Sequence, residues 1–171
     1  LSLFLYLSKR AKGNVLLNAV YQHLELIEKD YFGLQYCENG RWLDPTNQAS
    51  TVAFLVNFRG SFYFRVKFYV SDPSKLQEEY TRYHLYLQVR KDIMQGRLVV
   101  PPNTACLLAS YTVQSELGDY HPDEHAPGYL SEMALIPNQT EDMEHKICEL
   151  HKLHKYVLFH FTLFIFFCLS S

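Results

Sequence analysis

The sequence has few of the features that mark an enzyme or a metal site. Its 171 residues include only four cysteines (Cys37, Cys106, Cys148 and Cys168), and none of them forms a CxxC pair. It contains no GxGxxG and no P-loop motif. None of the cysteines has an arginine six residues later within a glycine-containing loop, the arrangement that a phosphate-cleaving thiolate requires. We therefore predict a reduced protein without a catalytic site, a cofactor or a metal ion.

The chain also lacks an excess of positive charge. Its net charge is −2 and its pI is about 6.5, which argues against a nucleic-acid partner because such proteins present a basic face. Hydrophobic residues make up 48% of the chain and aromatic residues 15%, enough for a sizeable core. The first methionine is Met94, so we expect this chain to be a fragment of a longer protein.

Histidines occur in two groups for which metal ligation is the alternative to consider. The first group has helical spacing and comprises His145, Glu149, His151 and His154. The second lies in the acidic, proline-containing segment 119–128 and comprises His121, Asp123, Glu124 and His125. No HExxH motif and no cysteine cluster accompanies either group, so we interpret the first as a solvent-exposed helix face and the second as a solvent-exposed loop.

One stretch, residues 74–98, carries a complete set of helix signals. Ser74 and Gln77 match a capping box, and Gly96 is a typical C-terminal stop. Apolar residues recur at three- and four-residue steps in two stripes. The first stripe is Leu76, Tyr80, Tyr83, Leu87 and Met94, and the second is Tyr86, Val89 and Ile93. We interpret these stripes as core packing of a helix that is covered on more than one side.

The rest of the pattern divides at residues 71–73, where the sequence reads Ser-Asp-Pro. Before this boundary we predict a helix at 14–26 and strands at 32–37, 41–43 and 62–70. After it we predict further helices at 104–117 and 139–155. Short strands with a helix, followed by helices alone, predict an α+β fold with two lobes.

Seven blocks, in this order and spacing, resemble the FERM domain of the band 4.1 superfamily. They are EKDYFGL at 28–34, RWLDP at 41–45, FRVKFY at 64–69, EYTRY at 79–83, GRL at 96–98, VQSELGDY at 113–120 and IPNQ at 136–139. The resemblance covers residues 13–155. Within the superfamily, VSDPSKLQEEY at 70–80, NTA at 103–105 and LLAS at 107–110 are most similar to the cytosolic, non-receptor tyrosine phosphatases that also carry a PDZ domain.

The resemblance implies a ubiquitin-like first lobe at 13–71, incomplete in its opening hairpin. It implies an acyl-CoA-binding-protein-like helical lobe at 72–155, with its last helix missing, and no PH-like third lobe. Segments 1–12, 48–60 and 156–171 depart from the family pattern, and at 48–60 apolar residues replace a stretch that is usually basic. We interpret the departures as translated intron or as a mis-joined gene.

The apolar tail at 156–169 leaves a membrane anchor open as an alternative. As a helix its 14 residues would span about 21 Å at about 1.5 Å per residue, whereas a bilayer core is about 30 Å thick. The tail is therefore short for a spanning helix, and a tail-anchored membrane protein ranks third among the candidate functions.

The function that the resemblance implies is a non-catalytic adaptor. It would link cytoplasmic tails of membrane proteins, or anionic lipids such as phosphoinositides, to cytoskeletal proteins at the cell cortex. The alternative is the targeting part of a non-receptor tyrosine phosphatase whose catalytic domain lies outside this chain. The candidate contacts to anionic lipid or to a partner are Lys9, Arg10, Lys12, Arg65, Lys67, Arg90, Lys91 and Arg97. We expect a cytoplasmic protein, peripheral at the plasma membrane.

Overall fold

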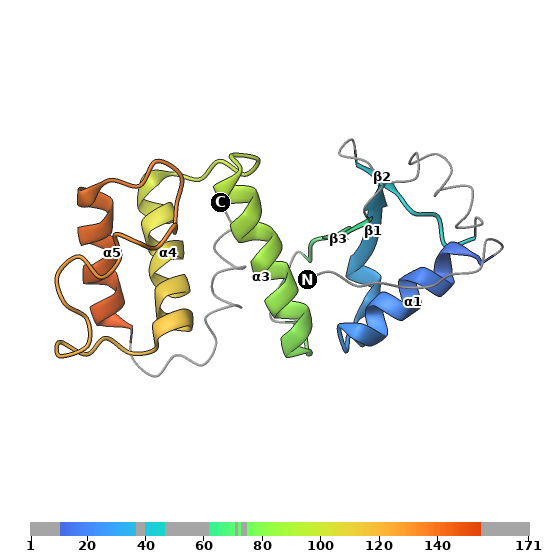
Figure 1. The fold of residues 1–171 in the computed structure, drawn as a ribbon, viewed down its shortest axis with the longest axis horizontal. Helices are drawn as coiled ribbons and strands as arrows, with labels where there is room; N and C mark the ends of the chain where they lie inside the picture. Colours follow the sequence, from blue (N-terminus) through green and yellow to red (C-terminus); the bar gives the residue numbers. More distant parts are fainter. Residues whose placement is uncertain (1–10, 37–39, 47–61, 71, 73–74, 155–171) are drawn as a thin grey trace. The chain divides into compact units, whose positions relative to one another are not determined.

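The computed structural model describes residues 11–36, 40–46, 62–70, 72 and 75–154. These residues form a mixed helix and sheet protein (Figure 1). They divide into two compact units, one containing residues 1–70 and 76–84 and the other containing residues 71–75 and 85–171. The predictions for the N-terminal segment up to residue 10, for 48–60 and for the apolar tail at 156–171 lie outside the described residues.

The first unit packs a helix on a three-stranded antiparallel sheet. Helix α1 (Gly13–His23) and the 3-10 turn η1 (Lys29–Tyr31) precede the strands β1 (Phe32–Tyr36), β2 (Arg41–Trp42) and β3 (Phe62–Val66). The strand order is β2-β1-β3. Side chains alternate between the two faces of a strand, so every second residue of β1 and β3 points toward α1.

The core of this unit is a mixed aliphatic and aromatic cluster. Leu16, Leu17 and Tyr21 of α1 are buried, as are Phe32 and Leu34 of β1. The Tyr21 hydroxyl donates a hydrogen bond of 3.0 Å to the carbonyl oxygen of Phe32, so the one polar atom of this ring is satisfied inside the core. The contact fixes the C-terminal end of α1 to the start of β1.

Two glutamates of the same unit cap each other's backbone. The Glu78 carboxylate accepts hydrogen bonds from the N–H groups of Ile27 (2.9 Å) and Glu28 (3.1 Å). In return, the Glu28 carboxylate accepts from the N–H groups of Gln77 (3.3 Å) and Glu78 (3.0 Å). Four backbone donors that belong to no helix or strand are thereby satisfied by two charged side chains.

The second unit is helical. Its long elements are α4 (Pro102–Leu117), α5 (Glu141–Leu153) and the last ten residues of α3 (Glu79–Met94). Small residues of α4, Ala105 and Ala109, lie in a buried cluster with Ile147 of α5 and with Leu135 and Ile136 of the connecting segment. Short side chains let the connecting segment and α5 approach α4 closely.

The structure corrects the start and the buried face of the helix predicted at 74–98. The helix begins at Glu79, and Gln77 and Glu78 precede it, so the predicted helix start at residue 74 is wrong; Ser74, the predicted cap, lies outside the described residues. Of the first predicted stripe, Leu76 is buried, whereas Tyr80, Tyr83 and Leu87 are exposed. The second stripe, Tyr86, Val89 and Ile93, is buried as predicted. Tyrosine tolerates either environment, so periodicity alone did not identify the covered face.

The other predicted elements are present with bounds that differ by a few residues. The strand predicted at 62–70 ends at Val66, and the helix predicted at 139–155 runs from Glu141 to Leu153. Helix α4 starts at Pro102, two residues before the predicted start, because proline is well suited to the first helical residue. Gly118 ends α4 with a φ of 77°, the left-handed backbone that favours glycine.

The carboxylate exchange makes folding stability depend on pH through Glu78. Burial, the largest influence, raises the pKa of Glu78, but hydrogen bonds and one nearby charge outweigh it and lower this pKa below the usual 4.5. These groups are the N–H groups of Glu28 and Ile27, the Thr81 hydroxyl and His84. The stabilisation is therefore present above about pH 4.5 and is lost as the pH falls through the folded-state pKa.

We predict that Glu78→Gln lowers the free energy of unfolding by about 1–3 kcal/mol at neutral pH, since one amide oxygen cannot replace the charged acceptor. Urea unfolding of the full chain measures this change. Glu79→Gln, which removes the same charge one residue further along, is the matched control and should change stability by less than about 1 kcal/mol. Equal unfolding midpoints for the two variants at neutral pH would contradict the role given to Glu78.

Candidate functional site

The predicted cationic contacts of the first unit lie on different elements. Lys12 is exposed at the N-terminal end of α1, Arg65 is half-buried on β3, and Lys67 is exposed directly after β3. Lys9 and Arg10 lie outside the described residues. The structure thus brings only Arg65 and Lys67 together, because residues two apart on a strand point to the same face.

Arg65 and Lys67 share one face of the sheet with two aromatic side chains. The strand register pairs Arg65 with Gly33 and Tyr63 with Gln35, and Gln35 in turn pairs with Trp42. The residues on this side, opposite the Phe32 and Leu34 side chains, are Gly33, Gln35, Trp42, Tyr63, Arg65 and Lys67. We call this surface the outer sheet face.

Gly33 allows the Trp42 ring to lie on the sheet. A Cβ atom at Gly33 would be 2.9 Å from two ring carbons of Trp42, closer than side chains pack, so only glycine leaves room for the ring at this position. The Lys67 ammonium lies 6.0 Å from the centre of the Trp42 ring, and the Arg65 guanidinium lies 5.9 Å from the centre of the Tyr63 ring. Each cation is thus held above an aromatic ring.

Two of the predicted cationic contacts in the second unit, Arg90 and Arg97, have carboxylate partners. Arg90 forms an ion pair of 2.6 Å with Glu116, and Arg97 forms one of 3.5 Å with Asp92. Lys91 is exposed on α3. Because the Glu116 and Asp92 carboxylates offset the charge of the two arginines, these arginines attract an external anion less strongly than a cation held by a ring.

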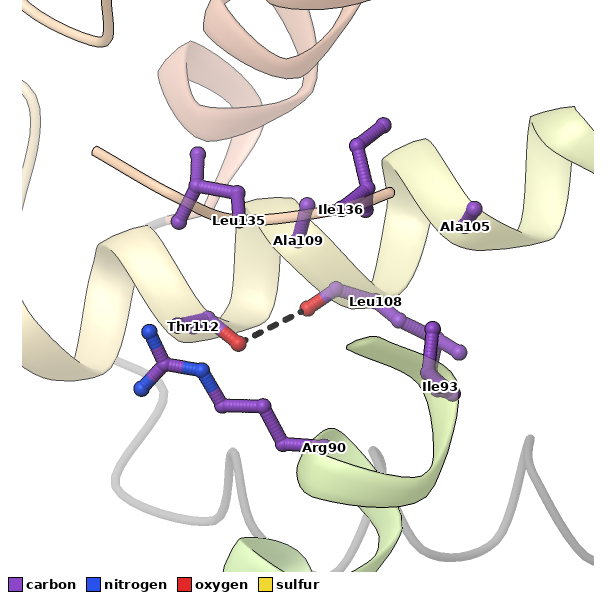
Figure 2. Close-up of a pocket in the computed structure, with 8 residues that line it drawn as sticks. All are labelled: Arg90, Ile93, Ala105, Leu108, Ala109, Thr112, Leu135 and Ile136. Carbon is purple, nitrogen blue, oxygen red and sulfur yellow. Dashed lines mark hydrogen bonds between the residues drawn. The ribbon is translucent and has the colours of Figure 1, made fainter. Parts of the chain in front are cut away.

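One small cavity occurs between helices of the second unit. Figure 2 shows Arg90 and Ile93 of α3 on one side of it and Leu108 and Thr112 of α4 on the other, with Leu135 at its rim. Its volume is about 10 Å³, room for about one water molecule and too little for an organic ligand. Inside it, the Thr112 hydroxyl donates to the Leu108 carbonyl oxygen at 3.3 Å.

A cluster of histidine and tyrosine side chains corrects the prediction of solvent-exposed histidines. His151 is fully buried and His125 is 8% exposed. The Tyr129 hydroxyl lies 2.8 Å from Nδ1 of His151, and Nε2 of His151 lies 2.8 Å from the Gly118 carbonyl oxygen. Since a carbonyl only accepts, Nε2 carries the proton and Nδ1 accepts from Tyr129. The ring therefore joins α5 to the end of α4.

Other histidines of these groups also have structural partners. Nδ1 of His125 lies 3.0 Å from the backbone nitrogen of His121, and its ring stacks with Tyr120 at 5.4 Å. The ring of His154 stacks on Tyr111 at 4.6 Å. His145 and Glu149 are exposed, as predicted. Within the described residues, no group of three or more His, Cys, Asp or Glu side chains is arranged to hold a metal ion.

The described residues contain no helix that is both long and apolar enough to cross a bilayer. The tail at 156–169, on which the membrane-anchor alternative depends, lies outside them.

Burial raises the pKa of the Cys106 thiol, which keeps this cysteine protonated and unreactive at neutral pH.

The geometry describes a mixed helix and sheet protein whose charged side chains are displayed on surfaces around two separate cores. Comparison of the sequence with models of protein families assigns the chain to one family. The FERM central domain matches residues 71–159, and the FERM N-terminal domain matches residues 3–53. The chain belongs to the FERM domain family. Both matches extend past the 13–155 span of the predicted resemblance, and the lobe boundaries remain a prediction.

Similar proteins come from two branches of this family. The chain is 53% identical to human tyrosine-protein phosphatase non-receptor type 4 over 154 residues, covering 86% of the chain and 16% of that protein. It is 46% identical to human band 4.1-like protein 4A over 151 residues, covering 85% of the chain and 22% of that protein. The chain therefore spans about a fifth or less of the length of these relatives.

Solved structures show the same fold. The FERM and C-terminal domain complex of Drosophila Merlin matches 98% of the chain and 61% of its own length, with a TM-score of 0.84 and 26% identity. The MyTH4-FERM MF2 domain of Dictyostelium discoideum myosin VII matches 94% of the chain and 37% of its own, with a TM-score of 0.67 and 14% identity. The resemblance to FERM domains stated from sequence blocks is confirmed.

Sequence reasoning missed the outer sheet face and the buried histidines for different reasons. Alternation did place Arg65 and Lys67 on one side of a strand, but Trp42 joins them through pairing that no local pattern encodes. The partners of His151 are 22 and 33 residues away along the chain. A histidine on the same helical stripe as Ile147 was the one available signal for its burial.

Burial of His151 predicts loss of stability in mild acid. Desolvation lowers the pKa of His151, and the charge of His125 lowers it further, against the opposing effects of Gly118 and Asp119. The unfolded chain then takes up a proton near pH 6.5 that the folded chain takes up only at lower pH. Stability is therefore complete above about pH 6.5 and falls as the pH drops toward the folded-state pKa.

We expect His151→Phe to reduce this pH dependence, by at most about 1.4 kcal/mol per pH unit, while lowering stability at neutral pH because the Gly118 carbonyl loses its donor. Thermal and urea unfolding between about pH 5 and pH 7.5 measure both effects. His145→Phe, on the exposed side of the same helix, is the control and should keep the wild-type slope. An unchanged slope for His151→Phe would show that another group carries the dependence.

Proposed function

We propose that this chain is a non-catalytic FERM-type adaptor, which links cytoplasmic tails of membrane proteins to cytoskeletal proteins at the cell cortex. Its membership of the FERM family carries the proposal, and similarity to band 4.1-like and Merlin proteins supports it. Arg65 and Lys67 of the first unit are compatible with this role. Each lies over an aromatic ring, and neither belongs to a catalytic cluster among the described residues.

The proposal includes a division of the chain. The first lobe, at 13–71, would be ubiquitin-like, and the second, at 72–155, would resemble acyl-CoA-binding protein. A helix packed on a β2-β1-β3 sheet is consistent with the first assignment, and the α4 and α5 pair is consistent with the second. The cavity of about 10 Å³ between α3 and α4 is too small for an acyl chain, so at this cavity the likeness would be one of fold.

The partners are proposed at two levels. Tails of membrane proteins and cortical cytoskeletal proteins are the primary partners, and phosphoinositides are a further candidate. Of the cations predicted for such contacts, Lys12 and Lys67 are exposed and Arg65 is half-buried in the first unit, and Lys91 is exposed on α3. The chain would then act in the cytoplasm, peripheral at the plasma membrane.

A second candidate function rests on one relative. The chain is 53% identical to a protein named as a non-receptor tyrosine phosphatase, of which it covers 16%. In this interpretation the chain is the targeting part of such an enzyme, and catalysis belongs to another domain of the parent. Sequencing the full-length transcript separates the two: a downstream cysteine-containing phosphatase loop supports the second candidate, and an open reading frame without one contradicts it.

The adaptor function predicts selective binding to cytoplasmic tails. We expect the purified chain to bind members of an array of cytoplasmic-tail peptides with Kd values of about 1–100 μM, typical of transient contacts to a single segment. Fluorescence anisotropy measures these values. Peptides from the extracellular juxtamembrane segments of the same proteins serve as the control. Equal binding to both sets, or to neither, would overturn the proposal.

A further inference from the structure

We propose that His125 and His151 form a pH-sensitive latch, which in mild acid releases residues 119–129 from α5 while α4 and α5 stay packed together. We call residues 119–129 the latch segment. The inference goes beyond the adaptor function and does not depend on it. It also differs from a general loss of stability, because it assigns the effect of acid to one segment of the second unit.

The latch segment has one buried residue, and that residue is a histidine. Among residues 119–129, only His125 is buried, at 8% exposure, and all the others are half-buried or exposed. The backbone hydrogen bonds of the segment close its own turns, as when the N–H groups of Glu124 and His125 donate to the His121 carbonyl oxygen. Separation from α5 therefore leaves these turns intact.

Aromatic rings make the contacts between the latch segment and α5. The centre of the His125 ring lies 5.4 Å from that of His151, in an edge-to-face arrangement. The rings of Tyr120 and Tyr129 lie 5.8 Å and 6.0 Å from the same ring. The Tyr129 hydroxyl also donates to Nδ1 of His151 at 2.8 Å. All of these contacts end on His151, so the charge of that one ring acts on the whole attachment.

The titratable groups around the two histidines lie on α5 and on the latch segment itself. The Asp119 carboxylate, just after α4, accepts from the Gln114 amide. The Lys152 ammonium lies 5.3 Å from the centre of the Tyr120 ring and pairs with Glu149 at 2.7 Å. The remaining groups are the Tyr129 hydroxyl, Cys148, which interacts with that hydroxyl, and His121, Asp123 and Glu124, which are exposed.

The closed arrangement disfavours a proton on His151. Desolvation lowers the pKa of His151 and the charge of His125 lowers it further, whereas Gly118 and Asp119 act in the opposite direction. Protonation would also make Nδ1 a donor, so the Tyr129 hydroxyl could no longer donate to it. Once the segment has left, the ring reaches water and binds a proton near the ordinary pKa of about 6.5. Release is therefore favoured as the pH falls below about 6.5.

The packing of α4 on α5 does not depend on the latch segment. Ala109 of α4 and Ile147 of α5 lie in one buried cluster, and the connecting chain rejoins this cluster at Leu130, directly after the segment. None of these side chains titrates. Nε2 of a protonated His151 still donates to the Gly118 carbonyl, since it carries a proton in both forms. Acid thus acts on the attachment of the segment and not on the apolar cluster.

Cleavage of the Glu124–His125 bond by a glutamate-specific endoprotease measures the release. Glu124 is exposed, but a protease holds several residues on each side of its site in extended form, so His125 must first leave the cluster. Cleavage after Glu144, in α5, reports unfolding of the helix instead. Synthetic peptides that span each site, digested in parallel, correct both rates for the pH dependence of the protease.

We expect corrected cleavage after Glu124 in the full chain to rise at least about threefold from pH 7 to pH 5.5. The limit is about eightfold, for one group with an open-state pKa near 6.5. Corrected cleavage after Glu144 should change less than about twofold. His151→Phe keeps a ring and His151→Gln keeps a donor for the Gly118 carbonyl; neither takes up this proton, so both should abolish the rise.

His121→Gln is the matched control. It replaces an exposed histidine of the same segment and should keep the wild-type response. Circular dichroism at pH 7 verifies that each variant is folded.

Three results would overturn the inference. The first is corrected cleavage after Glu124 that does not change with pH. The second is an equal rise after Glu144, which would show that the second unit unfolds as a whole. Both are read from the wild-type chain, so they hold even where a His151 variant does not fold. The third is a rise that persists in a folded His151 variant or disappears in His121→Gln.

Discussion

The start of α3 depends on an exchange of hydrogen bonds between two glutamates. Glu28 and Glu78 each accept from the backbone N–H groups beside the other, so the segment after α1 and the segment before α3 are held by four charge-assisted bonds. Glu78 also accepts from the Thr81 hydroxyl, inside the first turn of the helix. The helix begins where this network ends, and its starting point sets which residues face each core. The starting point fixes the rotation of the helix about its axis. With this rotation, the buried residues are Tyr86, Val89 and Ile93, and the exposed ones are Tyr80 and Tyr83.

The sheet of the first unit shows how one glycine shapes a surface. On the inner face, Phe32 stacks on Phe64 at 5.0 Å, and α1 covers both. On the outer face no helix is needed to cover Trp42, because the ring lies flat over Gly33 and the Lys67 stem. A larger residue at 33 would lift the indole from the sheet and separate it from Lys67. The same close approach that packs the ring also positions the Lys67 ammonium.

Local patterns predicted the elements of this fold more reliably than their partners. Alternation located β3, and a proline and a glycine bounded α4, because each signal acts within a few residues. The start of α3 could not be read this way, since the residues just before it, Gln77 and Glu78, donate to Glu28, about 50 residues earlier. Nor could the burial of His151, whose hydrogen-bond partners are Tyr129 and Gly118. The family was identified from ordered blocks, which record long-range pairing that physical periodicity does not express.

Eight cations were equivalent candidates in the sequence, and their surroundings distinguish the six that the structure describes. Arg90 and Arg97 lie within ion-pairing distance of carboxylates, so the field each projects into solvent is largely cancelled at distances beyond the pair. Lys67 lies over two aromatic rings, whose faces attract a cation yet carry no net charge. Its positive charge is therefore retained while its position is restricted. A cation that is both charged and pre-positioned recognises an anion at a smaller entropic cost than a freely rotating lysine.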